Sequence, residues 1–241
     1  MENNKKNSGK IKLFTIPYAG GTASVYNKWK DFLHSGIEMC EIELSGHGLR
    51  IKGALYNSFG EAVEDICKIV INQKGNDDYA IFGHSMGGLL TFEVIHRLME
   101  FGIQQPQHIF FSGINPPFAS RPYKSLYKLS DEEFIKEIFS YGGTPKELLV
   151  HEKLMKLFLP ILRSDYRIFE LYEYKTGRRL FDCDITVLSG KDDPLIEYDQ
   201  IDSWQECTTG YPKSFIFNGG HFFINEHIRE IVNIINTALV N

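Results

Sequence analysis

One short segment restricts the fold of this chain more than any other. The sequence GHSMGG occupies residues 83–88, between an apolar run at 79–82 and a helix-like segment at 89–99. The pattern G-x-S-x-G between a strand and a helix is typical of a strained turn, and the glycines two positions either side of the serine leave room for it because they lack a Cβ atom. The alternative is a glycine-rich turn whose serine only caps the helix. We predict that Ser85 is a nucleophile.

A serine nucleophile of this kind needs an acid and a histidine, which follow it in the order Ser, Asp, His. His221 follows two glycines at the end of an apolar run, residues 213–217, and precedes an amphipathic segment. An acidic pair follows another apolar run, residues 184–189. Open α/β sheets carry their sites on loops at the carboxyl ends of strands. We therefore predict His221 as the general base.

The acidic pair consists of Asp192 and Asp193, so one of the two has to be chosen. Asp193 lies three residues after Gly190 and directly before Pro194, which fixes the chain as it leaves the strand. We predict Asp193 as the acid that orients the histidine. Asp192 is then expected to face solvent or to cap the turn.

Two backbone N–H groups are needed to bind an oxyanion beside the serine. The N–H of Met86 lies in the first turn of the following helix, where it has no helical partner. An early apolar run, residues 12–16, leads into the glycine-rich loop PYAGG at 17–21. We predict that Ala19 in this loop supplies the second N–H, the alternative being an ordinary strand-to-helix turn.

Two other histidines lie close to these motifs in the sequence. His84 directly precedes the serine, and we expect its side chain to point away from the nucleophile and to serve in packing. His47 lies in the turn SGHG at 45–48, which follows the strand predicted over 37–43, and we expect it to be structural.

Apolar runs alternate with amphipathic segments along most of the chain. The predicted strands cover residues 12–16, 37–43, 79–82, 108–112, 185–188 and 214–217. The predicted helices cover residues 25–33, 58–72, 89–99, 201–207 and 225–239. Short, nearly continuous apolar strands between amphipathic helices predict an α/β fold, with a mainly parallel sheet covered by helices on both faces.

The alternation stops between about residues 114 and 181. Ser130 is a plausible helix N-cap with Glu133 at the capping-box position, and helical periodicity continues over 148–162 and 165–174. An insertion just after the strand that follows the serine's helix predicts a helical lid over the site. Most of its aromatic side chains should pack the lid on the rest of the chain, and a minority could line an acyl channel.

Length and composition favour a single catalytic unit. The 241 residues, of which 43% are hydrophobic, suffice for one large core, so we predict one domain over residues 11–241. Residues 1–10 are polar and are expected to form a disordered arm. The absence of a run of about 18 apolar residues argues against a membrane span, and the polar start argues against a signal peptide.

Several classes of function are disfavoured. The net charge of −5 argues against nucleic acid as a partner. No phosphate-binding or dinucleotide-binding motif is present, and we expect no cofactor and no metal. The four cysteines are scattered without C-x-x-C spacing, so we expect reduced thiols in a cytoplasmic protein.

Several segments together resemble the type II thioesterases, free-standing editing enzymes of non-ribosomal peptide and polyketide synthesis that have the α/β-hydrolase fold. They are PYAGG at 17–21, GHSMGG at 83–88, SDYR at 164–167, GKDD at 190–193 and NGGH at 218–221. The segments NPP at 115–117 and GGTPKEL at 142–148 also look like parts of that family's lid and its approach. The resemblance extends from about Lys12 to the end of the chain. One departure is Ser45, where the family pattern leads us to expect proline.

This resemblance implies a substrate that the triad alone does not. Nothing in Ser85, Asp193 and His221 distinguishes an oxygen ester from a thioester. The family implies acyl thioesters on phosphopantetheine of carrier proteins, from which stalled or mis-primed acyl groups are removed. The phosphopantetheine arm of the carrier protein would enter between the lid and the loop 18–21. We expect the enzyme to be a monomer.

Carrier proteins of this kind are usually acidic, so docking should need a basic or apolar patch. Arg121, Lys124 and Lys128 are candidates, with a solvated surface as the alternative. Two other functions remain open. One is a carboxylesterase or medium-chain fatty-acyl thioesterase acting on free small substrates, and the other is a hydrolase-fold protein that binds a ligand without turnover.

Overall fold

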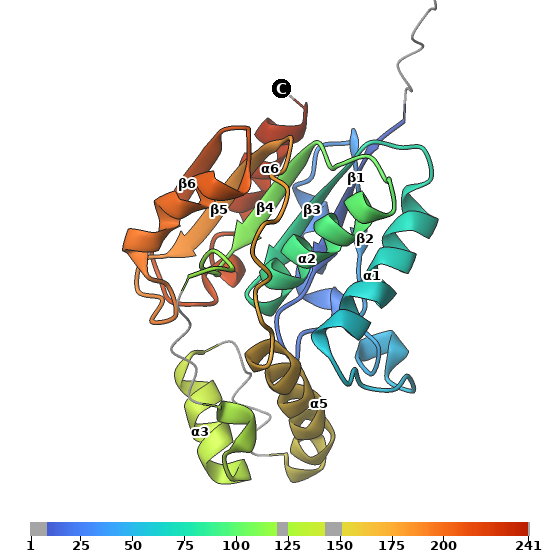
Figure 1. The fold of residues 1–241 in the computed structure, drawn as a ribbon. Coiled ribbons are helices and arrows are strands. Elements are labelled where there is room, and N and C mark those ends of the chain that lie inside the picture. Colours follow the sequence, from blue (N-terminus) through green and yellow to red (C-terminus); the bar gives the residue numbers. More distant parts are fainter. Residues whose placement is uncertain (1–8, 120–124, 143–150, 241) are drawn as a thin grey trace, which may run out of the picture.

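The computed structural model describes residues 9–119, 125–142 and 151–240. Its centre is a sheet of six parallel strands in the order β2-β1-β3-β4-β5-β6 (Figure 1). The strands are β1 Ile11–Ile16, β2 Ile37–Glu41, β3 Tyr79–His84, β4 His108–Ser112, β5 Asp184–Gly190 and β6 Pro212–Phe217. The predicted mainly parallel sheet is confirmed, and β2 ends two residues earlier than expected.

The helices agree with the predicted positions but not always with the predicted type. The α-helices are α1 Phe59–Lys74, α2 Met86–Glu100, α3 Asp131–Ser140, α5 Glu152–Glu170 and α6 Ile228–Val240. The 3-10 segments are η1 Ala23–Asp31, η2 Gly48–Arg50, η3 Leu126–Lys128, η4 Tyr198–Cys207 and η5 Phe223–Asn225. The segments expected as helices over 25–33 and 201–207 are therefore 3-10 helices. The last helix begins three residues later than expected because η5 forms a separate turn.

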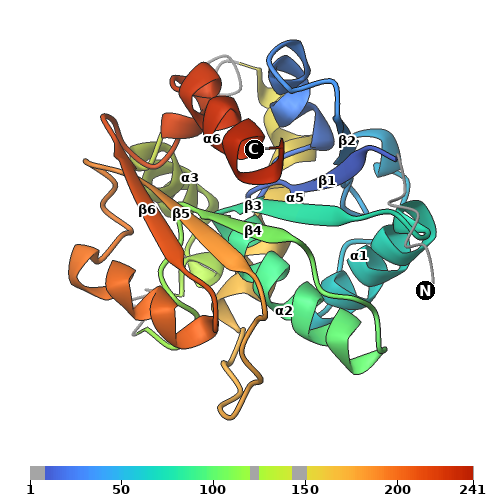
Figure 2. The same ribbon diagram turned by 90° about the horizontal axis from the view of Figure 1, so that it is seen from above.

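Helices cover both faces of the sheet, as the apolar strands require (Figure 2). On one face α1, α2 and η4 pack in a cluster that includes the stacked rings of Phe111 and Trp204. On the other face η1 and α6 pack around Trp29 and Phe82. β3 lies in the interior of the sheet, and all six of its residues are buried. This rigid strand leads directly into the serine turn.

The predicted lid contains two described α-helices, α3 and α5, and the 3-10 segment η3. α3 begins at Ser130, whose side chain and Glu133 form the expected capping box. The helical stretches predicted over 148–162 and 165–174 form one helix where they are described, because α5 runs unbroken from Glu152 to Glu170 with Pro160 inside it. Residues 148–150 lie outside the described residues, and residues 171–174 lie beyond the end of the helix. Figure 1 shows α3 and α5 beyond the end of the sheet where the chain passes from β3 into α2. They pack together through Phe134, Ile138 and Leu162.

Candidate active site

Ser85 lies on a strained turn between β3 and α2. Its backbone has φ 54 and ψ −120, a conformation that costs on the order of 1–3 kcal/mol outside glycine. A Cβ atom on Gly83 would lie 2.1 Å from the carbonyl oxygen of Gly87, and one on Gly87 would lie 2.3 Å from that of Ile16. Neither position can carry a side chain without moving the backbone, which is why glycine occupies both, as the sequence pattern predicts.

The structure brings Ser85 and the predicted histidine and acid into one hydrogen-bonded chain. Nε2 of His221 lies 2.9 Å from Oγ of Ser85, and Nδ1 lies 2.7 Å from Oδ2 of Asp193. A carboxylate only accepts, so Nδ1 donates to Asp193 and Nε2 is left to accept from the serine hydroxyl. His221 and Asp193 are each only 4% exposed, which excludes water from the pair. This is the tautomer that a general base needs.

The choice between the two acids agrees with this geometry. Asp193 is buried, and its second oxygen, Oδ1, accepts the N–H of Leu195 at 2.9 Å. Asp192 is exposed, and its N–H donates to the carbonyl of Gly219 at 2.9 Å. That backbone bond joins the loop after β5 to the loop after β6. The acid and the histidine are therefore held on two loops that are tied together.

The two residues predicted to supply the oxyanion donors lie beside the serine. Ala19, Ser85 and Met86 line one small cavity. Ala19 is the second residue of a β-turn closed by the bond from Gly21 N–H to the carbonyl of Tyr18, 2.8 Å. Within the described ranges, the N–H groups of Ala19 and Met86 have no hydrogen-bond acceptor. Both remain available to a substrate oxygen.

Two cavities meet at Ser85. The larger, about 290 Å³, lies between the loop 18–22 and the lid helices, and it is lined by His221 as well as by Ser85. It occupies the place where the sequence predicts a channel between the lid and the loop 18–21. The smaller, about 30 Å³, is lined by Ser85 together with Leu126, Phe169 and Leu195, but not by His221. The histidine therefore faces one of the two cavities only.

His84 is buried next to the catalytic-site histidine, His221. Its side chain is fully buried, and Nδ1 bonds to Oγ of Ser112 at 2.9 Å. Burial lowers the pKa of His84 well below its usual value, so the ring is neutral. The ring centre lies 5.0 Å from that of His221. The prediction of a packing residue is confirmed, but sequence reasoning missed that the ring packs against His221.

A second histidine–aspartate pair lies on the other side of the loop 17–21. His47 is 1% exposed, and its Nε2 lies 2.9 Å from Oδ2 of Asp165 on α5. The same oxygen accepts the N–H of Gly20 at 2.7 Å. Sequence reasoning expected His47 to be structural but missed this partner. The signal for Asp165 was its place in the segment SDYR, which contributed to the resemblance without a role of its own.

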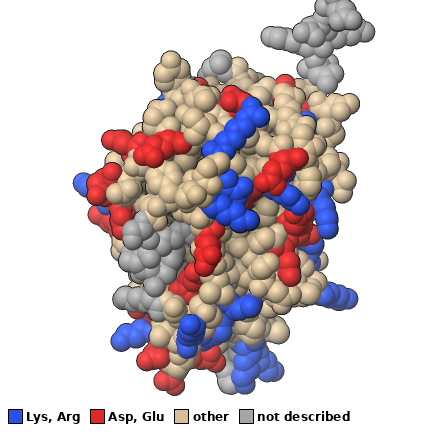
Figure 3. Space-filling view, in the orientation of Figure 1, with Lys and Arg blue, Asp and Glu red and all other residues tan. Residues whose placement is uncertain are grey.

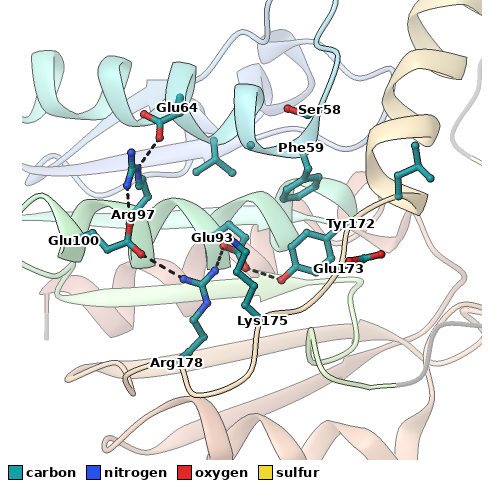
Figure 4. A pocket seen from close by; sticks show the side chains of 13 residues that line it. Ser58, Phe59, Glu64, Glu93, Arg97, Glu100, Tyr172, Glu173, Lys175 and Arg178 are labelled. Carbon is teal, nitrogen blue, oxygen red and sulfur yellow. Dashed lines mark hydrogen bonds and ion pairs between the residues drawn. The ribbon is translucent and has the colours of Figure 1, made fainter.

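A further cavity of about 440 Å³ lies away from the triad, between α1, α2 and the segment after α5 (Figure 4). Five of its charged side chains pair with one another. Arg97 bonds to Glu64 and Glu100, and Arg178 bonds to Glu93. A ligand there would have to break these pairs, so this cavity is not the candidate site.

The proposed basic docking patch is only partly described. Arg121 and Lys124 lie outside the described residues. Lys128 is exposed, with its Nζ 5.4 Å from the ring centre of Tyr127. On the face seen in Figure 3, basic and acidic side chains lie side by side rather than in patches of one sign.

All four cysteines are free thiols. Burial raises the pKa of Cys40 to about 11 and that of Cys67 to about 12, so both stay protonated near neutral pH. Over the described ranges, no helix has the length and apolarity to cross a membrane. Among the same residues, no group of three or more His, Cys, Asp or Glu side chains could hold a metal ion.

Comparison with known proteins identifies the family. The family model of the Thioesterase domain matches residues 11–239. The gramicidin S biosynthesis protein GrsT of Aneurinibacillus migulanus is 34% identical over 229 residues, which cover 95% of this chain and 89% of that protein. The medium-chain S-acyl fatty acid synthase thioesterase of Rattus norvegicus is 28% identical over 217 residues, covering 89% and 81%.

The solved structure of ClbQ from the colibactin NRPS/PKS pathway superimposes with a TM-score of 0.92 at 35% identity, covering 95% of this chain and 97% of that one. The fold, the matched span and the similarity to these proteins agree with one another. The chain belongs to the thioesterase family, with an α/β-hydrolase fold, and is a thioester hydrolase.

Proposed function

We propose that this chain hydrolyses acyl thioesters on the phosphopantetheine arm of carrier proteins and so removes stalled or mis-primed acyl groups from non-ribosomal peptide or polyketide synthetases. The observation that carries the proposal is the Ser85–His221–Asp193 chain, which opens onto a cavity between the lid and the loop 18–22. The similarity to GrsT and ClbQ over nearly the whole chain supports the biosynthetic role.

The geometry supports a two-step reaction. Oγ of Ser85 attacks the thioester carbon while its proton passes to Nε2 of His221, 2.9 Å away. The C–S bond then breaks, and the sulfur leaves as a thiol with that proton. A water molecule attacks the acyl-serine, giving its proton to His221, and the proton returns to Oγ as the acid leaves. Asp193 holds the ring in the required tautomer throughout.

The N–H groups of Ala19 and Met86 stabilise the negative oxygen of the tetrahedral intermediate. Both border the small cavity beside Ser85 and have no acceptor among the described residues. Donors of this kind contribute about 10²–10³-fold each to the turnover rate.

The lining of the two cavities supports a placement for each half of the substrate. Nε2 of His221 has to reach the leaving sulfur, so the pantetheine half lies in the cavity that His221 lines. The acyl half then lies in the cavity of about 30 Å³. Its lining includes Leu126, Phe169 and Leu195, whose apolar side chains suit an acyl group.

The experiment compares matched acyl groups on three carriers. Acetyl groups on a carrier protein should be hydrolysed with a higher kcat/KM than acetyl groups on pantetheine or coenzyme A, because contacts with the carrier protein add binding energy. Equal efficiency on all three would leave the hydrolase but discard the editing role.

A medium-chain thioesterase acting on free substrates is the second candidate, and the similarity to the rat enzyme favours it. It predicts a preference for octanoyl over acetyl groups, with no gain from the carrier protein. We also propose that the enzyme is a cytoplasmic monomer.

A further inference from the structure

Asp165 joins the lid to the loop that holds the proposed oxyanion donor. It lies on α5 and is only 1% exposed. Its Oδ2 accepts the N–H of Gly20 at 2.7 Å and lies 2.9 Å from Nε2 of His47. Three separate segments therefore meet at one buried oxygen: the lid helix, the loop 17–21 and the turn after β2.

The surroundings of His47 favour the charged ring. Nδ1 lies 3.0 Å from the carbonyl oxygen of Ser45, and Nε2 faces the carboxylate of Asp165. Both of these oxygens only accept, whereas a neutral imidazole has a single N–H. Burial lowers the pKa of His47, but the hydrogen bond and charge of Asp165, with a contribution from Glu43, outweigh burial and raise the pKa above 6.5.

His96 shows that the carboxylate makes the difference. It is also buried, and its ring nitrogens lie 2.9 Å and 3.1 Å from the carbonyl oxygens of Phe92 and Arg179. Neither partner carries a charge, and burial lowers the pKa of His96. Two acceptors alone therefore do not keep a buried histidine protonated.

The conformation of the loop 17–21 depends on this contact. Gly20 is the third residue of the turn that Gly21 and Tyr18 close, and its φ is +73, as a type II turn requires. A Cβ atom on Gly20 would lie 2.7 Å from Cδ1 of Leu162 on α5. The N–H of Gly20 donates to Asp165 on the lid helix, and the preceding residue, Ala19, lines the cavity beside Ser85.

We propose that Asp165 is a positioning residue: its carboxylate, paired with a protonated His47, fixes the Gly20 N–H and thereby aims the Ala19 N–H at the substrate oxygen. This rests on the oxyanion role given to Ala19 in the proposed function. Asp165 itself touches no reacting atom. Its loss should lower kcat more than it raises KM, because the oxyanion develops fully only in the transition state.

The test uses Asp165→Asn, His47→Gln and His47→Arg, each assayed on an aryl acetate and on acetyl-carrier protein. Asp165→Asn and His47→Gln should lower kcat about 10- to 100-fold on both substrates, as displaced catalytic groups do, with little change in KM. His47→Arg keeps a positive charge and several donors, so it should restore most of the activity lost in His47→Gln. The aryl acetate reports on the oxyanion hole even if the carrier substrate proves wrong.

The pH profile separates positioning from a merely structural role. In the wild type kcat should fall as pH rises through the pKa of His47, and His47→Arg should remove this alkaline decline. His96→Gln is the matched control: it removes a buried histidine without touching the loop 17–21, so it should lower the midpoint of urea unfolding while kcat stays close to wild type. The proposal is overturned if folded Asp165→Asn keeps kcat within about twofold of wild type, or if His47→Arg retains the alkaline decline.

Discussion

Two buried histidine–aspartate pairs lie on either side of the loop 17–21, and they differ in the partner of the second ring nitrogen of each histidine. The ring of His221 contacts Asp193 through Nδ1 and the hydroxyl of Ser85 through Nε2. A hydroxyl both donates and accepts, so this ring can be neutral and can take up a proton when the serine attacks.

The ring of His47 contacts Asp165 through Nε2 and a carbonyl oxygen, that of Ser45, through Nδ1. A carbonyl cannot donate, so this ring keeps both of its bonds only while it is charged. We propose that these similar pairs at similar burial serve different purposes: one passes a proton along the reaction path, and the other holds its proton and fixes the backbone.

The largest effect should follow from removing the hydroxyl that distinguishes the first pair. Ser85→Ala leaves His221 and Asp193 in place but removes the nucleophile, and loss of the comparable serine in a protease costs on the order of 10⁶ in kcat. Hydrolysis of acetyl-carrier protein is the measurement, with urea unfolding to show that the variant folds. Retention of more than about a tenth of the activity would exclude Ser85 as the nucleophile.

The next effect compares the two neighbouring acids. Asp193→Asn should lower kcat about 10⁴-fold, because an amide can donate to Nδ1 and so hold His221 in the wrong tautomer. Asp192→Asn is the matched control, since Asp192 is exposed and bonds to the loop after β6 through its backbone N–H. It should lower kcat only slightly. The reverse ranking would show that Asp192 is the acid that acts on His221.

The smallest effect concerns the stability of the second pair. Because the pKa of His47 is raised above 6.5 in the folded chain, folding is stabilised in full below about pH 6.5, and this stabilisation is lost as pH rises through the raised value. The free energy of unfolding in urea should therefore fall between pH 6 and pH 9 by more in the wild type than in His47→Arg. Equal losses in the two proteins would argue against a charged His47.

The catalytic chain could be predicted from the sequence because each member carries a local signal. Gly83 and Gly87 mark the strained turn, because a Cβ atom at either position would lie 2.1 or 2.3 Å from a backbone carbonyl oxygen. Asp193 precedes a proline, and His221 follows two glycines. Each signal depends only on residues a few positions away in the chain.

The second pair could not be predicted in the same way. His47 and Asp165 are 118 positions apart, and neither lies in a segment whose spacing indicates the other. The residues around Asp165 also explain why the lid helix α5 was predicted as two stretches, 148–162 and 165–174. Only residues 163–164 separate the two predicted stretches, but in the structure α5 continues through them, Asp165 is buried within it and Ser164 bonds to the carbonyl of Tyr56. Local periodicity does not show that a polar residue faces the interior.

Nitrogen-15 NMR of the imidazole rings tests the contrast between the two pairs most directly. In a titration from pH 6 to pH 10, His47 should show both ring nitrogens protonated at the start and should lose one proton at a higher pH than an unperturbed histidine, with His47→Arg identifying its signals. His221 in its neutral form should keep the proton on Nδ1, the nitrogen that faces Asp193. A His47 ring that is already neutral at pH 6 would contradict the account.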